Sequence, residues 1–208
     1  MSRKIALITG ASRGLGKSTA LHLAAQGVDI IGTYQSREAD AQATVAEIQA
    51  LGSKAHMLQL DVGQSDSFDS FAKQLGSVLK EVFSAEHFDF LVNNAGVGIY
   101  NSIAQTTEDQ FDQLVNIHFK GPFFLTQKLL PLIADGGRIV NLSSGLARFS
   151  MVGYAAYASM KGAVEVWSRY LAQELGPRGI NVNVLAPGAI ATDFGGGTVR
   201  DNPDVNKM

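Results

Sequence analysis

Short runs of aliphatic and β-branched residues alternate along the chain with longer segments in which apolar residues recur at helical spacing. The short runs predict strands at residues 4–9, 28–33, 54–60, 88–93, 138–142 and 180–185. The longer segments predict helices at residues 15–26, 38–51, 67–83, 108–133 and 157–175. Strands that alternate with helices are typical of parallel sheets built from crossover units, so the pattern predicts one α/β domain.

The handedness of the crossover connections limits the possible strand orders of the sheet. Because parallel crossovers are almost always right-handed, six such strands predict a three-layer, doubly wound sheet in the order 3-2-1-4-5-6. Ligands bind such sheets beyond the carboxyl ends of the strands, where the winding direction reverses. We therefore expect the chemistry of this chain at that edge.

Several residues mark helix ends. Thr107 followed by Gln110 predicts a capping box at the start of the helix at 108–133. Pro122 lies inside that helix and should interrupt it near residues 118–121, because proline has no backbone donor. Glycines suited to a left-handed C-terminal turn follow three of the predicted helices: Gly27, Gly52 and Gly176.

Composition adds three constraints. The chain has 208 residues, 46% of them apolar, which is enough for the core of one domain. Its 17 Lys and Arg against 19 Asp and Glu favour a small-molecule ligand over nucleic acid or a membrane surface. The absence of cysteine excludes disulfides and thiol nucleophiles. The short apolar run at residues 5–8 is too brief for a signal peptide, so we expect a cytoplasmic location.

The segment at residues 5–16, I-A-L-I-T-G-A-S-R-G-L-G, predicts a strand, a tight turn and the start of a helix. Gly10 permits the turn, Gly14 lets the backbone approach a ligand closely, and Gly16 lets the helix pack against the strand. Free amides at a helix N-terminus favour an anion such as a pyrophosphate. The segment therefore predicts a dinucleotide site.

The spacing T-G-x-x-x-G-x-G resembles that of the short-chain dehydrogenase/reductase family, which has a Rossmann fold. Further motifs of the family follow in order: Asp61-Val62, Asn93-Asn94-Ala95-Gly96 and Pro187-Gly188. The resemblance implies that Asp61 and Val62 border the adenine, and that residues 187–190 with Thr192 contact the nicotinamide carboxamide. The full set of cofactor-binding residues that it implies is Gly10, Ser12, Arg13, Gly14, Leu15, Gly16, Asp61, Val62, Asn93, Ala95, Gly96, Tyr157, Lys161, Pro187, Gly188, Ile190 and Thr192.

Residues after the second predicted strand bear on cofactor choice. NAD enzymes commonly end this strand with an acidic residue that binds the ribose hydroxyls, whereas this chain has Tyr34 there. Arg13, Ser36 and Arg37 offer positive charge and hydrogen bonds to a 2′-phosphate. We therefore expect NADP(H) as the preferred cofactor, with NAD(H) possible. In the alternative interpretation Arg37 only solvates the next helix.

The candidate catalytic residues are Ser144, Tyr157 and Lys161. Tyr157 and Lys161 are four residues apart, so a helix places both on one face, while Ser144 follows the fifth predicted strand. By resemblance, Tyr157 transfers the proton, Ser144 hydrogen-bonds the substrate oxygen, and Asn116 holds a water in a relay with Lys161. The positive charges of Lys161 and of the oxidised nicotinamide should lower the phenol's pKa from about 10 toward neutrality.

Two other groups of residues leave alternatives open. Tyr154 lies seven residues before Lys161, the spacing of the family's enoyl-thioester reductases, and we assign it instead to the substrate wall or to packing. The histidines show no metal-ligand spacing and are interpreted as packing or surface residues, so no metal is expected: His22, His56, His87 and His118.

The resemblance covers residues 4–194 and implies a hydride-transferring ketoreductase, similar to the 3-oxoacyl-thioester reductases. The alternatives are an NAD-dependent alcohol or sugar dehydrogenase and a non-catalytic NADP(H)-binding regulator. The family's usual seventh strand has no counterpart, and residues 195–208 are predicted to form a flexible tail that begins a substrate-covering segment. The resemblance also implies a homodimer or homotetramer, with neither nucleic-acid nor membrane partners.

Overall fold

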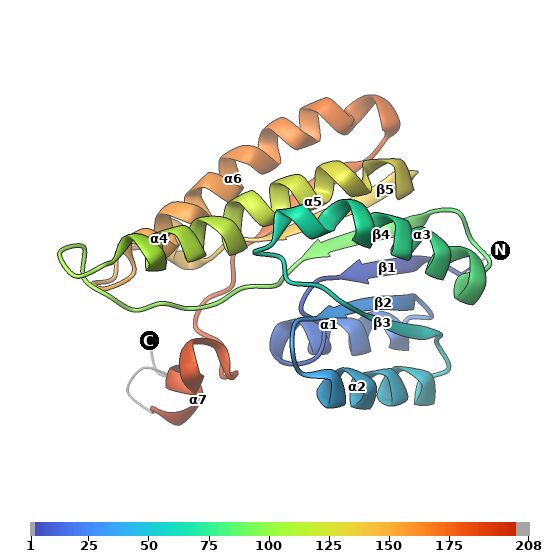
Figure 1. The fold of residues 1–208 in the computed structure, drawn as a ribbon, viewed down its shortest axis with the longest axis horizontal. Coiled ribbons are helices and arrows are strands. Elements are labelled where there is room, and N and C mark those ends of the chain that lie inside the picture. The colour runs from blue at the N-terminus through green and yellow to red at the C-terminus, as the bar shows by residue number, and fades with distance from the viewer. Residues whose placement is uncertain (1–2, 203–208) are drawn as a thin grey trace.

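A computed structural model describes residues 3–202 of the chain. Its centre is a six-stranded parallel sheet in the order β3-β2-β1-β4-β5-β6, as predicted (Figure 1). The strands are β1 (Ile5–Ile8), β2 (Asp29–Tyr34), β3 (Ala55–Gln59), β4 (Phe88–Asn93), β5 (Ile133–Leu142) and β6 (Asn181–Leu185).

Helices cover both faces of the sheet. In Figure 1, α1 (Gly14–Ala25) and α2 (Glu38–Ala50) lie below it, while α3 (Phe68–Phe83), α5 (Gly121–Leu129) and α6 (Ala155–Leu175) lie above it. Strand β1 is buried on both faces and supplies alternate residues to two cores. Leu7 joins the core under α3, α5 and α6, and Ile8 joins the core under α1 and α2.

The predicted helix at 108–133 is interrupted where Pro122 indicated. Helix α4 (Glu108–Val115) begins with the predicted capping box, in which the amide of Gln110 donates to the Thr107 hydroxyl. A π-helical turn at Asn116–Lys120 follows, and α5 then begins with the proline in its first turn. The predicted C-terminal boundary was wrong, because α5 ends at Leu129, a short 3-10 turn at Leu130–Leu132 follows, and β5 already begins at Ile133.

Two of the three helix-ending glycines were predicted correctly. Gly27 and Gly52 have φ of 81° and 83°, the left-handed conformation that only glycine adopts without strain. The prediction of a left-handed turn at Gly176 was wrong, since its φ of −51° continues the helix into a 3-10 turn at Gly176–Arg178. Gly179, with φ of 65°, makes the left-handed turn instead, and its amide donates to the Gly176 carbonyl.

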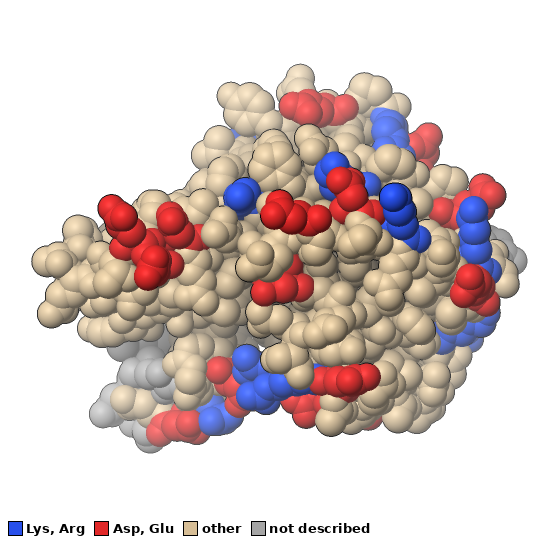
Figure 2. All heavy atoms as spheres, in the orientation of Figure 1, with Lys and Arg blue, Asp and Glu red and all other residues tan. Residues whose placement is uncertain are grey.

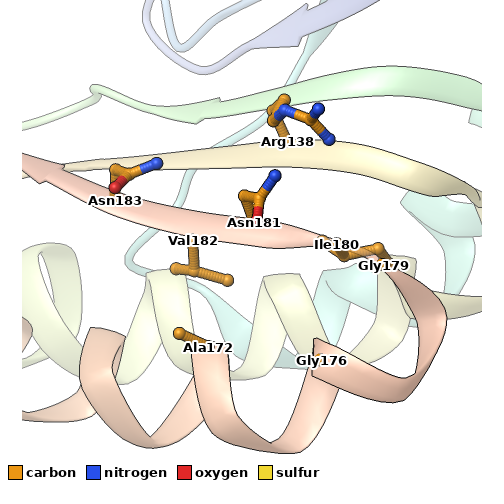
Figure 3. A pocket seen from close by; sticks show the side chains of 8 residues that line it. All are labelled: Arg138, Ala172, Gly176, Gly179, Ile180, Asn181, Val182 and Asn183. Atoms are coloured by element: carbon orange, nitrogen blue, oxygen red, sulfur yellow. The ribbon is translucent and has the colours of Figure 1, made fainter.

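Strand β6 forms one edge of the sheet, and within the described residues no strand pairs with its outer side. A pocket of about 280 Å³ lies at the amino end of this strand. Figure 3 shows Arg138, Asn181 and Asn183 on one face of the β5–β6 pair, with Val182 pointing toward α6 on the other. This pocket is at the opposite end of the strand from the carboxyl edge of the sheet.

Part of the predicted tail is folded. Residues Phe194–Gly197 form a turn in which Gly195 and Gly196 have positive φ angles, and Thr198–Asp201 form the short helix α7. Residues 203–208 of the predicted tail lie outside the described part. On the face drawn in Figure 2, acidic side chains gather over α4, and elsewhere the two signs are interspersed. Between residues 3 and 202, no helix is both long and apolar enough to cross a bilayer.

Candidate active site

The predicted site residues lie in loops at the carboxyl ends of the strands, the edge toward which the arrowheads point in Figure 1. These loops follow β1, β2, β3, β4, β5 and β6, and α6 adds its first turns. One edge of the sheet therefore gathers the predicted cofactor turn and the predicted catalytic residues.

The glycine-rich turn after β1 has the geometry expected of it. Gly10 and Gly14 have positive φ angles of 67° and 57°, which disfavour any other residue. A Cβ atom on Gly16 would lie 2.1 Å from the Gly10 carbonyl oxygen, so only glycine lets α1 pack this close to the turn. Among residues 3–202, Arg13, the N-cap of α1, makes no side-chain cap and the first turn holds no acid, so the positive end of the helix dipole is suited to an anion.

The loop after β4 is bonded to this turn. The side-chain amide of Asn94 donates to the carbonyls of Thr9, at 2.8 Å, and Gly10, at 3.2 Å. The Thr9 hydroxyl accepts from the amides of Asn94 and Ala95, both at 3.0 Å. Asn94 was absent from the predicted set although the N-N-A-G motif contained it, and its role is to hold the two loops together.

The residues predicted to choose the cofactor lie after β2 and in the glycine turn. Tyr34 ends β2, and Ser36 and Arg37 follow it as exposed residues. Arg13 lies 3.5 Å from the Asp193 carboxylate, and Arg37 lies 3.4 Å from Asp40. All four side chains of these ion pairs are roughly half exposed, so each pair contributes little to stability and leaves its arginine available to an anion.

The loops after β3 and β6 complete the crevice. Asp61 accepts hydrogen bonds from the Gly63 amide and from the Gln35 side chain, while Val62 is buried. After β6, the Pro187 carbonyl accepts from the Gly145 amide at 3.0 Å, and Gly188 and Ile190 lie exposed. Thr192 faces the glycine turn, 3.9 Å from where a Cβ atom on Gly14 would lie.

Tyr157 and Lys161 share the buried face of α6, with only 7% and 5% of their surfaces exposed. The Lys161 Nζ atom is 5.5 Å from the centre of the Tyr157 ring and donates a 2.7 Å hydrogen bond to the Leu142 carbonyl at the end of β5. Ser144 lies two residues beyond β5, and its side chain acts on the Tyr157 phenol by lowering its pKa. The structure therefore brings the three predicted residues together.

The protein's own groups raise the pKa of Tyr157, whereas the predicted lowering also depended on the charge of the oxidised nicotinamide. Burial raises the pKa of the phenol to about 12, the hydrogen bond with Ser144 lowers it in part, and Tyr154 raises it further. Lys161 directs its ammonium at the Leu142 carbonyl. Burial lowers the pKa of Lys161 to about 8. At neutral pH the pair therefore consists of a neutral phenol and a largely charged ammonium.

The π-helical turn presents His118 to this pair. The His118 ring packs edge-on against Tyr157, with ring centres 5.1 Å apart and an angle of 88°. Burial, and next the charge of Lys161, lower the pKa of His118 to about 3, so the imidazole is neutral. Asn116 opens the turn half-buried, and within the described residues no hydrogen bond joins its side chain to Lys161. His118 was interpreted from the sequence as a packing or surface histidine; it is buried, and its contact with the catalytic pair was not predicted.

Aromatic rings surround the phenol. Tyr154 lies between Tyr100 and Tyr157, with ring centres 5.4 and 6.4 Å away. The Phe194 ring lies 5.9 Å from Tyr157 on another side and rests against Gly98. Because Tyr100 and Phe194 are exposed, the mouth of the site is an apolar, aromatic surface.

The family model described as short chain dehydrogenase matches residues 4–203. A hydroxynaphthalene reductase-like protein, Arp2 of Metarhizium brunneum, is 36% identical over 199 residues, which are 93% of this chain and 71% of that protein. A Burkholderia cenocepacia short chain dehydrogenase solved with NADP superposes with a TM-score of 0.89 and 35% identity, covering 99% of this chain and 81% of that one. The angucycline C-6 ketoreductase LanV, solved with NADP, gives 0.91 and 35%, covering 98% and 78%. The chain belongs to the short-chain dehydrogenase family of oxidoreductases.

Proposed function

We propose that this chain is an NADPH-dependent ketoreductase in which Tyr157 donates the proton, Ser144 hydrogen-bonds the substrate oxygen and Lys161 supplies positive charge. One observation carries the proposal: a neutral phenol is buried between a serine hydroxyl and an ammonium, at the sheet edge that holds the glycine-rich turn. A phenol held in its protonated form suits the reducing direction, in which the developing alkoxide needs an acid.

The residues of the crevice fit a dinucleotide. The positive-φ glycines let the backbone approach a pyrophosphate, and the free amides at the start of α1 would bind its oxygens. Arg13 and Arg37 would hold a 2′-phosphate, and Tyr34 brings no carboxylate to repel it. The NADP-bound relatives support the same choice. The other predicted cofactor contacts at residues 61–62, 93–96 and 187–192 are proposed on their place in this crevice.

Each residue of the site has one role in the transfer of the hydride and the proton. NADPH, held by the glycine turn with Arg13 and Arg37, would supply the hydride that the carbonyl carbon accepts. The C=O π electrons move to the oxygen, which takes the proton of the Tyr157 phenol and becomes the alcohol. Ser144 stabilises the charge that develops on that oxygen, and the Lys161 ammonium favours the phenolate left behind. Asn116 remains a predicted participant, supported by its place at the start of the π-helical turn.

We propose a planar aromatic ketone as the substrate class. The rings of Tyr100, Tyr154 and Phe194 form the apolar mouth beside the phenol, and flat rings stack favourably on such a surface. The names of the relatives, a hydroxynaphthalene reductase-like protein and an angucycline ketoreductase, agree with it. In this assignment Tyr154 is a wall of the substrate site.

A homodimer formed through α5 and α6 is proposed as the assembly. Phe123, Phe124, Val166 and Tyr170 of these helices are partly exposed, and Phe123 stacks on Trp167 with ring centres 5.5 Å apart. Exposed apolar clusters of this kind are typical of subunit contacts. The cytoplasmic location stays a prediction from the sequence.

The test follows the loss of NADPH absorbance with three carbonyl classes: a polycyclic aromatic ketone, a small aliphatic ketone and an enoyl thioester. We expect turnover to be fastest with the aromatic ketone, and faster with NADPH than with NADH. Turnover of the enoyl thioester that depended on Tyr154 would reassign the catalytic tyrosine. Tight NADPH binding without turnover of any of the three would favour a regulator over an enzyme.

A further inference from the structure

Glu165 is a mostly buried carboxylate that the proposed mechanism does not use. It lies on α6 at the same four-residue spacing that separates Tyr157 from Lys161, so the three side chains follow one another on one side of the helix. Only 18% of its side chain is exposed. Because a carboxylate loses hydration when it is buried, a glutamate in such a place needs polar partners.

The partners of Glu165 lie in the loop that follows β5. Its Oε1 atom accepts a 3.0 Å hydrogen bond from the Ser143 hydroxyl, and its Oε2 atom lies 3.6 Å from the Arg148 guanidinium. Ser143 is only 4% exposed, whereas 69% of the Arg148 side chain is exposed. An exposed ion pair contributes little to stability, so the buried bond to Ser143 is the main attachment between this carboxylate and the loop.

Ser143 is held both to the sheet and to α6. Its amide donates to the Leu185 carbonyl of β6 at 2.8 Å. Its hydroxyl lies 3.2 Å from the Lys161 carbonyl and 3.0 Å from the Glu165 carboxylate, and a hydroxyl has one hydrogen to donate. The charged acceptor at the shorter distance forms the stronger bond. Glu165 therefore determines how firmly Ser143 is held to the helix.

Ser144 is the next residue along the chain, so its position depends on that of Ser143. Its backbone is extended, with φ of −157° and ψ of 150°, and its hydroxyl oxygen accepts from the Leu146 amide at 3.2 Å. That bond uses a lone pair of the oxygen and leaves the hydroxyl hydrogen for another acceptor, such as a substrate oxygen. Any movement of Ser143 would therefore move a hydroxyl that is already oriented for donation.

Backbone hydrogen bonds hold this loop to the neighbouring strand. The Gly145 amide donates to the Pro187 carbonyl at 3.0 Å, close to the bond between Ser143 and the end of β6. These bonds fix the loop relative to the sheet but not relative to α6, the helix that carries Tyr157. Glu165 supplies a link between the loop and that helix.

We propose that Glu165 is a positioning residue for Ser144. Its carboxylate holds Ser143 against α6, and this attachment keeps the Ser144 hydroxyl beside the proton donor Tyr157. The inference rests on the proposed function, because it concerns the role of Ser144 toward the substrate oxygen. In this arrangement Glu165 contributes to turnover through Ser144 alone.

The first test compares Glu165→Leu, which removes both oxygens, with Glu165→Gln, which keeps an acceptor for Ser143. We expect the leucine variant to lower kcat for ketone reduction by about 10-fold, less than the roughly 10²- to 10³-fold that the loss of a whole donor to the reacting oxygen costs. The Michaelis constant for NADPH should change little, and the glutamine variant should recover most of kcat. A glutamine variant as slow as the leucine variant would overturn the role of the bond to Ser143.

The matched control is Glu174→Leu, because Glu174 is exposed near the other end of α6. It should keep the turnover of the wild type. An unchanged kcat in Glu165→Leu would overturn the proposal.

The second test repeats Glu165→Leu in a Ser144→Ala background. We expect no further loss of kcat there, because the hydroxyl that Glu165 positions is already absent. Equal fold losses in the two backgrounds would mean that Glu165 only supports the fold, and would overturn the proposal. If the leucine variant fails to fold, Ser143→Ala removes the same hydrogen bond from the loop side and takes its place in both backgrounds, under the same criteria.

Failure of the proposed function is recognised separately. If Ser144→Ala alone keeps full turnover, the role assigned to Ser144 toward the substrate is wrong. A crystal structure of Glu165→Leu then decides the attachment itself, because it needs no turnover. We expect residues 143–148 to be displaced from α6 in that structure, and a loop that stays in place would overturn the attachment.

Discussion

The imidazole of His118 stands edge-on to the phenol of Tyr157, with 5.1 Å between ring centres, and both rings adjoin the Lys161 ammonium. Three ionisable side chains from two helical segments therefore lie next to one another in the core. Burial keeps the phenol and the imidazole neutral and makes the ammonium easier to deprotonate. Four predictions follow from this arrangement and from the turn that faces it.

Tyr157→Phe should lower kcat for ketone reduction by about 10²- to 10⁴-fold, because it removes the proton donor and leaves the ring. NADPH binding, measured by the fluorescence of the cofactor, should change little. Tyr154→Phe is the matched control at the neighbouring ring, and it should keep most of the turnover. Equal losses in the two variants would contradict the assignment of Tyr157.

The alkaline limb of the pH profile should report Lys161. The pKa of this ammonium is about 8 and that of Tyr157 about 12, so kcat should fall above pH 8 while the phenol is still protonated. Lys161→Met should remove this limb together with most of the activity. A profile that stays flat to pH 11 would show that the charge of Lys161 is not needed.

Acid stability should depend on His118. Its pKa is 6.5 when unfolded and about 3 when folded, so between these values the unfolded chain binds a proton that the native chain does not. The stabilising contribution is complete above pH 6.5 and is lost as the pH falls toward 3, up to roughly 5 kcal/mol. The melting temperature should therefore fall less between pH 7 and pH 4 in His118→Asn than in the wild type or in His22→Asn. Parallel curves for all three would contradict the burial of a neutral ring.

Gly16→Ala should damage the cofactor turn, since the added Cβ atom would lie 2.1 Å from the Gly10 carbonyl oxygen. We expect a loss of about 1–3 kcal/mol in the free energy of unfolding and weaker NADPH binding. Gly76→Ala in α3 is the control, because nothing lies within 4 Å of its added atom, and it should stabilise by about 0.5–1 kcal/mol. Chemical denaturation of both variants measures the difference, and similar losses would contradict the packing argument.

The sheet and most of the site were predictable because they depend on local signals. Alternating strands and helices predict a doubly wound parallel sheet once right-handed crossovers are assumed, and 3-2-1-4-5-6 is a common order of such sheets. The four-residue spacing of Tyr157 and Lys161 brings both to one face of α6 wherever the helix begins. The glycine turn was predictable for the same reason, since Gly10, Gly14 and Gly16 are each required by backbone geometry.

The parts that were missed depend on tertiary contacts. The sequence pattern gives no facing direction for His118, because the π-helical turn changes the helical register beside it. The early start of β5 at Ile133 is set by pairing with Phe88 of β4, which a run of small and polar residues at 134–137 does not reveal. The raised pKa of Tyr157 likewise follows from burial, a property of the assembled core.

The π-helical turn at Asn116–Lys120 has a consequence for engineering. Deleting one residue would restore a regular α-helix and would swing the side chains before the deletion by about 100° relative to α5. Such a deletion, made to raise the melting temperature, would rotate the His118 imidazole out of the core. It would also separate His118 from Lys161 and Tyr157. The irregular turn should therefore be kept fixed in any stabilised version of this enzyme, with substitutions directed to the outer faces of α2 and α3.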